Sequence, residues 1–277
     1  MRWRSLRRSA NVDDRRRGGV GLPRGAGIGG GAALIILVVV LLLGGDPSTL
    51  LNLSEDAGGA GTTAAPPADD EEAAFASAVL ASTEDVWTAL FAEQGGRYQP
   101  PVLVLYTDAV QSACGFGSAA SGPFYCPADH KVYLDLGFFQ ELARLGGAGD
   151  FAGAYVIGHE VGHHVQQLMG TSERVRSLQA RRGGAEANAL SVSLELQADC
   201  YAGVWAHRAN RERAVLESGD VEEGLAAAAA IGDDRLQRQV GGRVQPETFT
   251  HGTSAQRAQW LRTGIERGTL EACDTFR

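Results

Sequence analysis

The sequence predicts an α+β fold, mainly helical with a small β-sheet, preceded by one N-terminal membrane-spanning helix. Residues 101–106 form a short apolar run, and residues 131–136 alternate apolar with polar residues; both patterns are typical of strands. From Phe138 onward the apolar residues recur mainly at helical spacing. A stretch without charge near the N-terminus predicts the membrane helix. The 277 residues are enough for one well-filled domain with an appendage.

The N-terminal region combines a basic tail with an apolar stretch. Residues 1–24 contain eight arginines and two aspartates, and residues 25–45 carry no charged side chain. As a helix, residues 25–45 would span roughly 30 Å, about one hydrocarbon core. A buried core helix seldom lacks every polar residue over such a run, and a cleaved signal peptide would show a small-x-small site after it. We therefore expect an uncleaved anchor, with the basic tail in the cytoplasm and residues 46–277 outside it.

The remainder of the chain divides into a linker and a domain. Residues 46–70 are rich in Gly, Ala, Thr, Pro and acidic residues, with little to bury, which is typical of a flexible linker. The domain is expected at residues 71–277. The formal net charge of −8 at pH 7 would repel phosphate, so nothing indicates a nucleic-acid-binding protein.

Within the domain the sequence predicts a first helix, then strands, then further helices. Residues 71–95 have near-helical spacing, and the two strands at residues 101–106 and 131–136 follow them. Residues 112–130 are rich in Gly, Ser and Pro and are expected to form a loop. The later helices are expected at residues 137–145, 151–169, 172–182, 186–209, 219–231 and 253–267.

The four cysteines indicate disulfides, because their number is even and the domain is expected outside the cytoplasm. None belongs to a C-x-x-C pair, which argues against a zinc ribbon. Of the three possible pairings we expect Cys114–Cys126, which would close the loop of residues 112–130. We also expect Cys200–Cys273, which would hold the C-terminal segment against a helix.

One stretch, "YVIGHEVGHHVQQLMG" at residues 155–170, has the residue types of a metal site. His159 and His163 are four residues apart, so a helix places both imidazoles on one face. Glu160 lies about 100° around the helix from His159, where it can act as a general base without binding the metal. This is the H-E-x-x-H arrangement of zinc metalloproteases. The alternative is a solvated helix face that carries incidental histidines.

Two glycines argue against that alternative. Gly158 and Gly162 lie inside the predicted helix, where each costs about 1 kcal/mol relative to Ala. Such residues usually mark the close approach of another element, so a partner helix is expected against this one.

A third metal ligand is expected in "LSVSLELQADCYAGVWAH", because catalytic zinc has three protein ligands and an open position. Glu195 and Asp199 are four residues apart among apolar side chains, and burying them without partners would be costly. We interpret Glu195 as the ligand and Asp199 as the acceptor for the N–H of a ligating histidine. The alternative is an acidic pair at a helix start, or an ion pair with Arg208.

A donor for a developing oxyanion is also expected. His251 in "FTHGTSAQR" directly precedes a helix capped by Thr253 or Ser254, and its imidazole could serve. Arg257 and Tyr155 are competing candidates. A peptide substrate is expected to lie extended beside the strand of residues 131–136, paired through its backbone.

Several blocks of the sequence together resemble the bacterial "putative neutral zinc metallopeptidase" family, from about Phe75 to the C-terminus. They are "CGFGSAASGPFYCPADHKVYLDLGFF", "GDFAGAYVIGHEVGHHVQ", "LSVSLELQADCYAGVWAH", "GDVEEGLAAAAAIGDDRLQ" and "FTHGTSAQRAQW". The resemblance implies a zincin-like, gluzincin-type peptidase domain anchored in the bacterial cell membrane. It implies one Zn²⁺ per chain held by His159, His163 and Glu195, with Glu160 in catalysis.

Two rival functions remain open at this point. One is a membrane-tethered regulatory or scaffold module that holds zinc for structure only, with Cys200 or His164 as a fourth ligand. The other is a different metal-dependent hydrolase, such as an amidase acting on the cell wall. Hydrolysis of peptides that a chelator abolishes would favour the peptidase.

Overall fold

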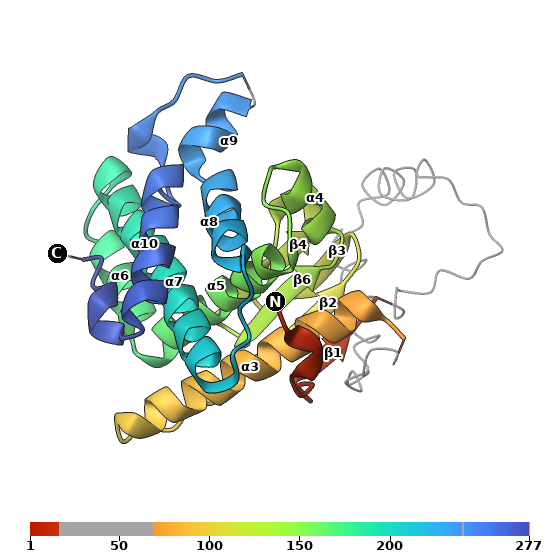
Figure 1. The fold of residues 1–277 in the computed structure, drawn as a ribbon. Helices are drawn as coiled ribbons and strands as arrows, with labels where there is room; N and C mark the ends of the chain where they lie inside the picture. Colours follow the sequence, from red (N-terminus) through yellow and green to blue (C-terminus); the bar gives the residue numbers. More distant parts are fainter. Residues whose placement is uncertain (17–68, 240, 277) are drawn as a thin grey trace, which may run out of the picture.

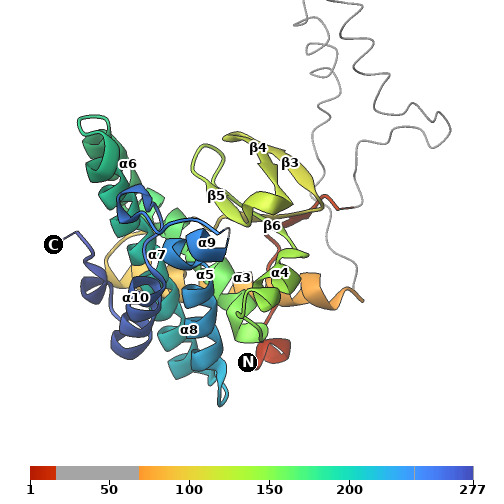
Figure 2. The same ribbon diagram turned by 90° about the horizontal axis from the view of Figure 1, so that it is seen from above.

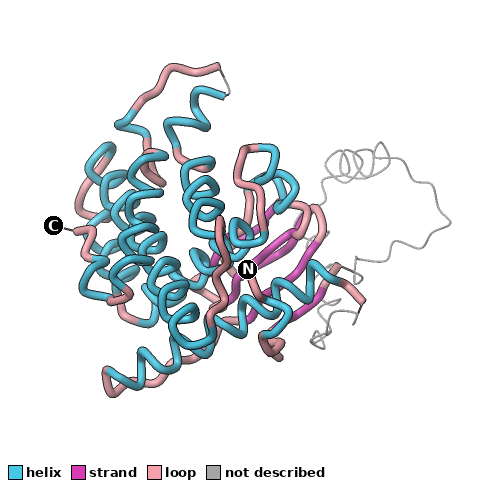
Figure 3. Tube along the Cα trace, viewed as in Figure 1, coloured by secondary structure: helices cyan, strands magenta, loops and turns pink. Residues whose placement is uncertain are grey.

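The sheet of the protein has three parallel strands and one antiparallel edge strand. The computed structural model describes residues 1–16, 69–239 and 241–276. Within them the strand order is β1 (Val12–Asp14), β2 (Val102–Tyr106), β6 (Lys131–Asp135) and β5 (Phe124–Cys126). β1, β2 and β6 run parallel, and β5 pairs antiparallel with β6. β6 is therefore an interior strand, and β5 is the edge strand beside it. Figure 3 shows the strands of the sheet side by side, in magenta.

Two strands form a separate hairpin that covers part of the sheet. They are β3 (Ala109–Ser112) and β4 (Gly115–Ser118), and the Cys114–Cys126 disulfide joins their turn to the end of β5. In Figure 2 the hairpin and β5 lie together at one side of the molecule. The expectation of a loop at residues 112–130 was therefore wrong. Strands of three or four residues are too short for alternation to reveal, and their pairing with neighbouring strands defines them.

The α+β class with mainly helical content is confirmed. Figure 1 shows the sheet on one side of the molecule and most helices on the other, with α5 between them. The helices are α3 (Glu71–Glu93), α4 (Phe138–Arg144), α5 (Asp150–Leu168), α6 (Thr171–Gln179), α7 (Gly184–Arg213), α8 (Asp220–Ala230), α9 (Asp233–Gln239) and α10 (Ser254–Arg267). Short 3-10 turns occupy Trp3–Ser5, Ala119–Ser121, Pro246–Thr248 and Leu270–Cys273. Each helix expected within residues 71–277 is present, and α9 is the one α-helix of the described residues that was not expected.

The core lies between the sheet and helices α3, α5 and α7. Leu103 and Leu105 of β2 face these helices and pack in one cluster with Trp87, Ile157 and Trp205. The alternate residues of the same strands, with Val110 of the hairpin, form a second cluster on the opposite face. Helices thus cover one face of the sheet and the β3–β4 hairpin lies on the other.

Gly158 and Gly162 of α5 mark the crossing of α7, as the sequence predicted. A Cβ atom on Gly158 would lie 2.9 Å from the Trp205 ring. A Cβ atom on Gly162 would lie 2.9 Å from the backbone oxygen of Ala198. Both glycines therefore let α5 and α7 approach closely, which brings the side chains of their facing turns together.

The N-terminal residues pack on the domain, which differs from the predicted division into a tail of residues 1–24 and a domain of residues 71–277. β1 pairs with β2, so that Val12 lies opposite Leu103. Trp3 is buried, and its ring packs edge-on against Phe75 at 5.5 Å between centroids. A stretch with so many arginines gave no strand signal, because β1 has only three residues and two of them are aspartates.

The predicted membrane span at residues 25–45 lies outside the described residues, as does most of the predicted linker at 46–70. Among the described residues, no helix has the length and apolar character needed to cross a membrane. Two described residues on either side of this gap lie close to each other, since the Arg16 guanidinium is 2.8 Å from the Asp70 carboxylate.

Candidate metal centre

Helices α5 and α7 bring His159, His163 and Glu195 to one point. The Nε2 atom of His159 is 3.1 Å from one carboxylate oxygen of Glu195, and the Nε2 atom of His163 is 3.3 Å from the other. One ligand atom from each of the three residues lies within 4.8 Å of the others. The close crossing at Gly162 makes this possible, because Glu195 lies one turn before Ala198 on α7.

This donor set fits a zinc ion. Two imidazole nitrogens and one carboxylate oxygen are a usual ligand set for catalytic zinc, which keeps a further position open. Both rings direct Nε2 toward Glu195, and both use Nδ1 for another bond. The site therefore has nitrogen donors whose orientation is already fixed by their neighbours.

The partner of His159 confirms the expectation for Asp199. The Nδ1 atom of His159 is 2.7 Å from Asp199 Oδ1 and donates to it. The same carboxylate accepts the Tyr155 hydroxyl at 2.6 Å and both Nε and Nη2 of Arg257 at 2.9 Å. Asp199 is fully buried and Arg257 nearly so. The carboxylate therefore orients the His159 ring while its own charge is neutralised by Arg257.

The protonation of these groups depends on their mutual contacts. Burial alone would raise the pKa of Asp199, but Arg257 and His159 hold this pKa at about 2. Burial would lower the pKa of His159, but the Asp199 and Glu195 carboxylates raise it to about 10. Burial would likewise raise the pKa of Glu195, and His163 and His159 bring it well below its usual value. A metal must therefore displace protons from these imidazoles, so zinc binding should weaken as the pH falls.

Gln166 holds the second histidine and was not identified from the sequence. Its Oε1 atom accepts from His163 Nδ1 at 2.9 Å. Its Nε2 atom donates to the backbone oxygen of Leu194 at 2.7 Å. Gln166 therefore ties the His163 ring to the turn of α7 that carries Glu195. Its position three residues after His163, on the same helix, was the one available signal.

The three residues lie in a cleft of about 1320 Å³. Glu160 also lines this cleft, and within the described residues its carboxylate makes no hydrogen bond to another side chain. The cleft is bordered by residues of the segment between Cys114 and Cys126, as expected, including Gly122, Pro123, Phe124 and Tyr125. Glu160 therefore faces the space that a ligand of the metal centre would occupy.

His251 lines the same cleft and is paired with Asp233. Its side chain is 52% exposed, and its Nδ1 atom is 3.2 Å from Asp233 Oδ1. The backbone N–H of His251 donates to Asp233 Oδ2 at 2.7 Å. The hydrogen bond that His251 donates to Asp233 raises the pKa of His251, and burial opposes this only in part. Asp233 was not identified from the sequence, because α9, which it begins, was not expected.

The other two candidates for an oxyanion donor have different surroundings. The Tyr155 hydroxyl and the Arg257 guanidinium are both bound to Asp199, and Arg257 Nη2 also donates to Tyr155 at 3.1 Å. Burial raises the pKa of Tyr155 well above its usual value. Both groups therefore support the His159 orientation, and His251 is the candidate with a side chain free to meet a ligand.

Comparison with known proteins places this chain among uncharacterised relatives. It is 48% identical to the "Uncharacterized protein YpfJ" of Escherichia coli (strain K12), over all of this chain and 99% of the relative. It is 43% identical to the "Uncharacterized protein Rv2575" of Mycobacterium tuberculosis (strain H37Rv), over 70% of this chain and 67% of the relative. No solved structure is detectably similar. The model of the family described as "Putative neutral zinc metallopeptidase" matches residues 1–276, and the chain belongs to that family.

Proposed function

We propose that the protein is a zinc-dependent peptidase that hydrolyses peptide bonds with an activated water molecule. The observation that carries the proposal is the convergence of His159, His163 and Glu195 on one point of an open cleft that Glu160 also lines. Zinc held there would supply Lewis-acid chemistry, polarising the scissile carbonyl and making hydroxide accessible near neutral pH.

The chain's own residues perform the proton transfers. Glu160 takes the proton of the attacking water and returns one to the leaving amine. His251, whose pKa Asp233 raises, donates a hydrogen bond to the oxyanion that develops on the carbonyl. The support for this role is its half-exposed position in the cleft together with its carboxylate partner.

The substrate position must be changed from the one expected from the sequence. The strand of residues 131–136 corresponds to β6, which already has β2 and β5 as neighbours and cannot accept a further strand. β5 is the edge strand next to β6, and Phe124 and Tyr125 of β5 line the cleft. We propose that an extended peptide pairs with β5 through its backbone, since an exposed edge offers unpaired N–H and C=O groups.

A structural zinc site is disfavoured, because the two candidates for its fourth ligand, Cys200 and His164, are engaged in other bonds. A closed site needs a fourth protein ligand. Cys200 forms a disulfide with Cys273, so its sulfur is not available. His164 uses both ring nitrogens, one toward Tyr125 and one toward the Gln99 backbone oxygen. The two disulfides also support our proposal that the domain works outside the reducing cytoplasm.

Two substitutions test this function when compared side by side. Glu160→Gln removes the proton acceptor and keeps the side-chain size, so zinc should stay at one ion per chain while peptide hydrolysis falls by about 10²–10⁴-fold. His163→Ala removes a ligand, so zinc and activity should be lost together. Glu212→Gln, the same chemical change at an exposed residue of α7, is the control and should change neither.

The opposite results would identify the rival functions. If Glu160→Gln lost its zinc, Glu160 would be a ligand and Glu195 would need another role. If Glu160→Gln kept both its zinc and full activity, hydrolysis would not occur at this site. If the wild-type protein bound zinc but hydrolysed no peptide, a scaffold or a different hydrolase would be favoured.

A further inference from the structure

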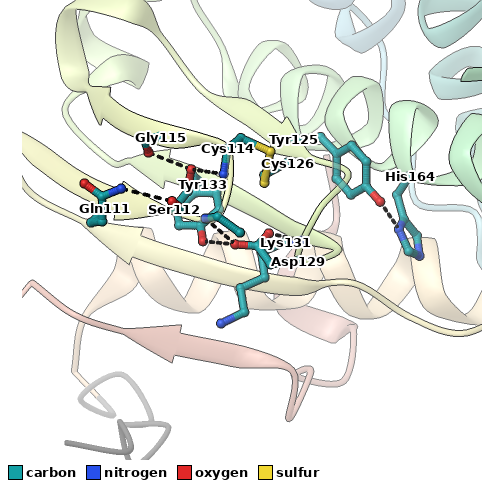
Figure 4. Close-up of a disulfide and its surroundings, with 11 residues drawn as sticks. Gln111, Ser112, Cys114, Gly115, Tyr125, Cys126, Asp129, Lys131, Tyr133 and His164 are labelled. Atoms are coloured by element: carbon teal, nitrogen blue, oxygen red, sulfur yellow. Dashed lines mark hydrogen bonds between the residues drawn. A yellow bond between two sulfur atoms is a disulfide. The ribbon is translucent and has the colours of Figure 1, made fainter. Parts of the chain in front are cut away.

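One side-chain hydrogen bond connects the edge strand β5 with the metal-binding helix α5. The Tyr125 hydroxyl lies 3.0 Å from His164 Nδ1, and in the described part of the chain no other side-chain bond joins these two elements. Figure 4 shows the two side chains directed toward each other, beside the Cys114–Cys126 disulfide. His164 directly follows His163, so the strand is fastened at the turn of α5 that holds the metal ligand.

The chemistry of the His164 ring fixes the direction of this bond. Its Nε2 atom is 2.6 Å from the backbone oxygen of Gln99, which can only accept, so Nε2 carries the proton. In a neutral imidazole the other nitrogen is then an acceptor, and the Tyr125 hydroxyl donates to it. His164 is fully buried, and the rings of Tyr98, Tyr125 and His130 surround it at 5.3 to 5.8 Å between centroids. The ring therefore has one position and one tautomer.

β5 has few other contacts that could fix its distance from α5. β5 has three residues and one hydrogen-bonded neighbour, β6. The disulfide at Cys126 ties the strand to the β3–β4 turn, on the sheet face away from α5. Phe124 packs in the cluster on that same face, whereas Tyr125 packs toward the helices. Tyr125 is thus the residue of β5 that can set the distance between the strand and the metal centre.

We propose that His164 is a positioning residue that holds β5, through Tyr125, at the distance from the metal centre that a strand-paired peptide requires. This inference rests on the proposed function. Consecutive residues of a helix point about 100° apart, so His163 and His164 can serve the metal and the strand from one helical turn. The distance between a peptide paired with β5 and the metal centre is then fixed in advance, and the scissile bond lies next to Glu160.

The variant that tests this is Tyr125→Phe, which removes one hydroxyl and leaves the ring and backbone in place. If the Tyr125–His164 bond positions β5, then in the variant the strand spends a smaller fraction of time in the position that can pair with a peptide. The apparent affinity for peptide falls by that fraction. The KM for peptides long enough to pair with β5 should rise by about 2- to 10-fold, the equilibrium effect of one neutral hydrogen bond. The kcat and the zinc content should not change, because the loss affects ground state and transition state equally.

A second measurement needs no activity. In the zinc-loaded protein, the β5 amides that are bonded to β6 should exchange with deuterium faster in Tyr125→Phe than in the wild type, by a similar factor. Tyr106→Phe is the matched control, since it removes a buried hydroxyl of β2 that has no hydrogen-bond partner in the structure. In a double variant with His164→Gln, whose amide can still donate to Gln99, the effect of Tyr125→Phe should shrink below about twofold.

The two arms separate the possible failures. If the wild type hydrolyses no peptide, the proposed function fails, and the exchange measurement alone decides on the positioning role. If Tyr125→Phe matches Tyr106→Phe in both exchange and KM, the positioning role is overturned even in an active peptidase. A fall in kcat with unchanged KM and exchange would also overturn it, because the hydroxyl would then act in the chemical step.

Discussion

Arg257 of α10 and Asp199 of α7 form a buried two-point ion pair behind the metal centre. Arg257 Nε lies 2.9 Å from Asp199 Oδ2, and Nη2 lies 2.9 Å from Oδ1. The same Oδ1 atom accepts the Nδ1–H of His159. Three helices therefore meet at one carboxylate, and the orientation of a metal ligand on α5 depends on a residue near the C-terminal end of the chain.

The first prediction concerns Asp199→Asn. The amide keeps the shape but removes the charge that favours the His159 N–H bond, so zinc affinity should fall by about 10- to 100-fold. The change also leaves the Arg257 charge buried without its partner, which should lower the free energy of unfolding by roughly 3–5 kcal/mol. Zinc titration and urea unfolding of the same variant measure the two effects.

Glu93→Gln is the control for this experiment. It breaks the exposed ion pair with Arg208 of α7, where the atoms are 2.9 Å apart, and should cost less than about 1 kcal/mol without affecting zinc. If Asp199→Asn bound zinc as the wild type does, the carboxylate would have no role in orienting His159.

The second prediction concerns the pH dependence of activity. Asp233 raises the pKa of His251, so the imidazolium persists above its usual range and is lost as the pH rises through the raised value. Asp233→Asn should lower that pKa and move the alkaline limb of the kcat/KM profile to lower pH. The acidic limb of the same profile should change little. Rate profiles of the two proteins measure the shift. Asp234→Asn is the control, because Asp234 bonds Ser254 instead of His251. If the alkaline limb of Asp233→Asn matched that of the wild type, His251 would have no role in the mechanism.

The sequence was sufficient for those parts of the fold and site that depend on local spacing. The helices expected within residues 71–277 are present because their apolar residues recur at helical spacing. His159 and His163 could be paired because both lie on one helix, and the acidic pair on α7 pointed to Glu195 and Asp199. Both disulfide pairings are confirmed as well.

The parts that the sequence did not show depend on contacts between elements and not on the pattern within one element. β1 and β5 are strands because β2 and β6 pair with them, and three residues carry too little pattern to reveal it. Arg257 was considered as an oxyanion donor, but its proximity to Asp199 across 58 residues makes it an ion-pair partner. Asp233 could not be linked to His251 without α9, which has no buried residue to create an apolar pattern.

The third prediction concerns Gly162→Ala. Alanine has the higher helix propensity, by about 1 kcal/mol, so an isolated helix would be stabilised. Here the new methyl group would lie 2.9 Å from the backbone oxygen of Ala198, and overpacking costs typically ~1–3 kcal/mol. We expect a net loss of stability in urea unfolding and weaker zinc binding, because α5 and α7 must separate. Gly183→Ala is the control, since a Cβ atom there meets nothing within 4 Å. If Gly162→Ala were more stable than the wild type, the crossing of α5 and α7 would have room for a methyl group.

The last prediction concerns the compartment of the N-terminal residues. β1 and β2 are hydrogen-bonded neighbours, so residues 1–16 and 71–277 must lie on the same side of any membrane. A single crossing within residues 25–45, as the sequence suggested, would separate them. Exposed serines at 5 and 177 allow a matched test through Ser5→Cys and Ser177→Cys, because the described residues include no free cysteine. A membrane-impermeant maleimide added to intact cells should label both variants or neither, and both after lysis. Labelling of only one variant in intact cells would show that β1 does not pair with β2 in the cell.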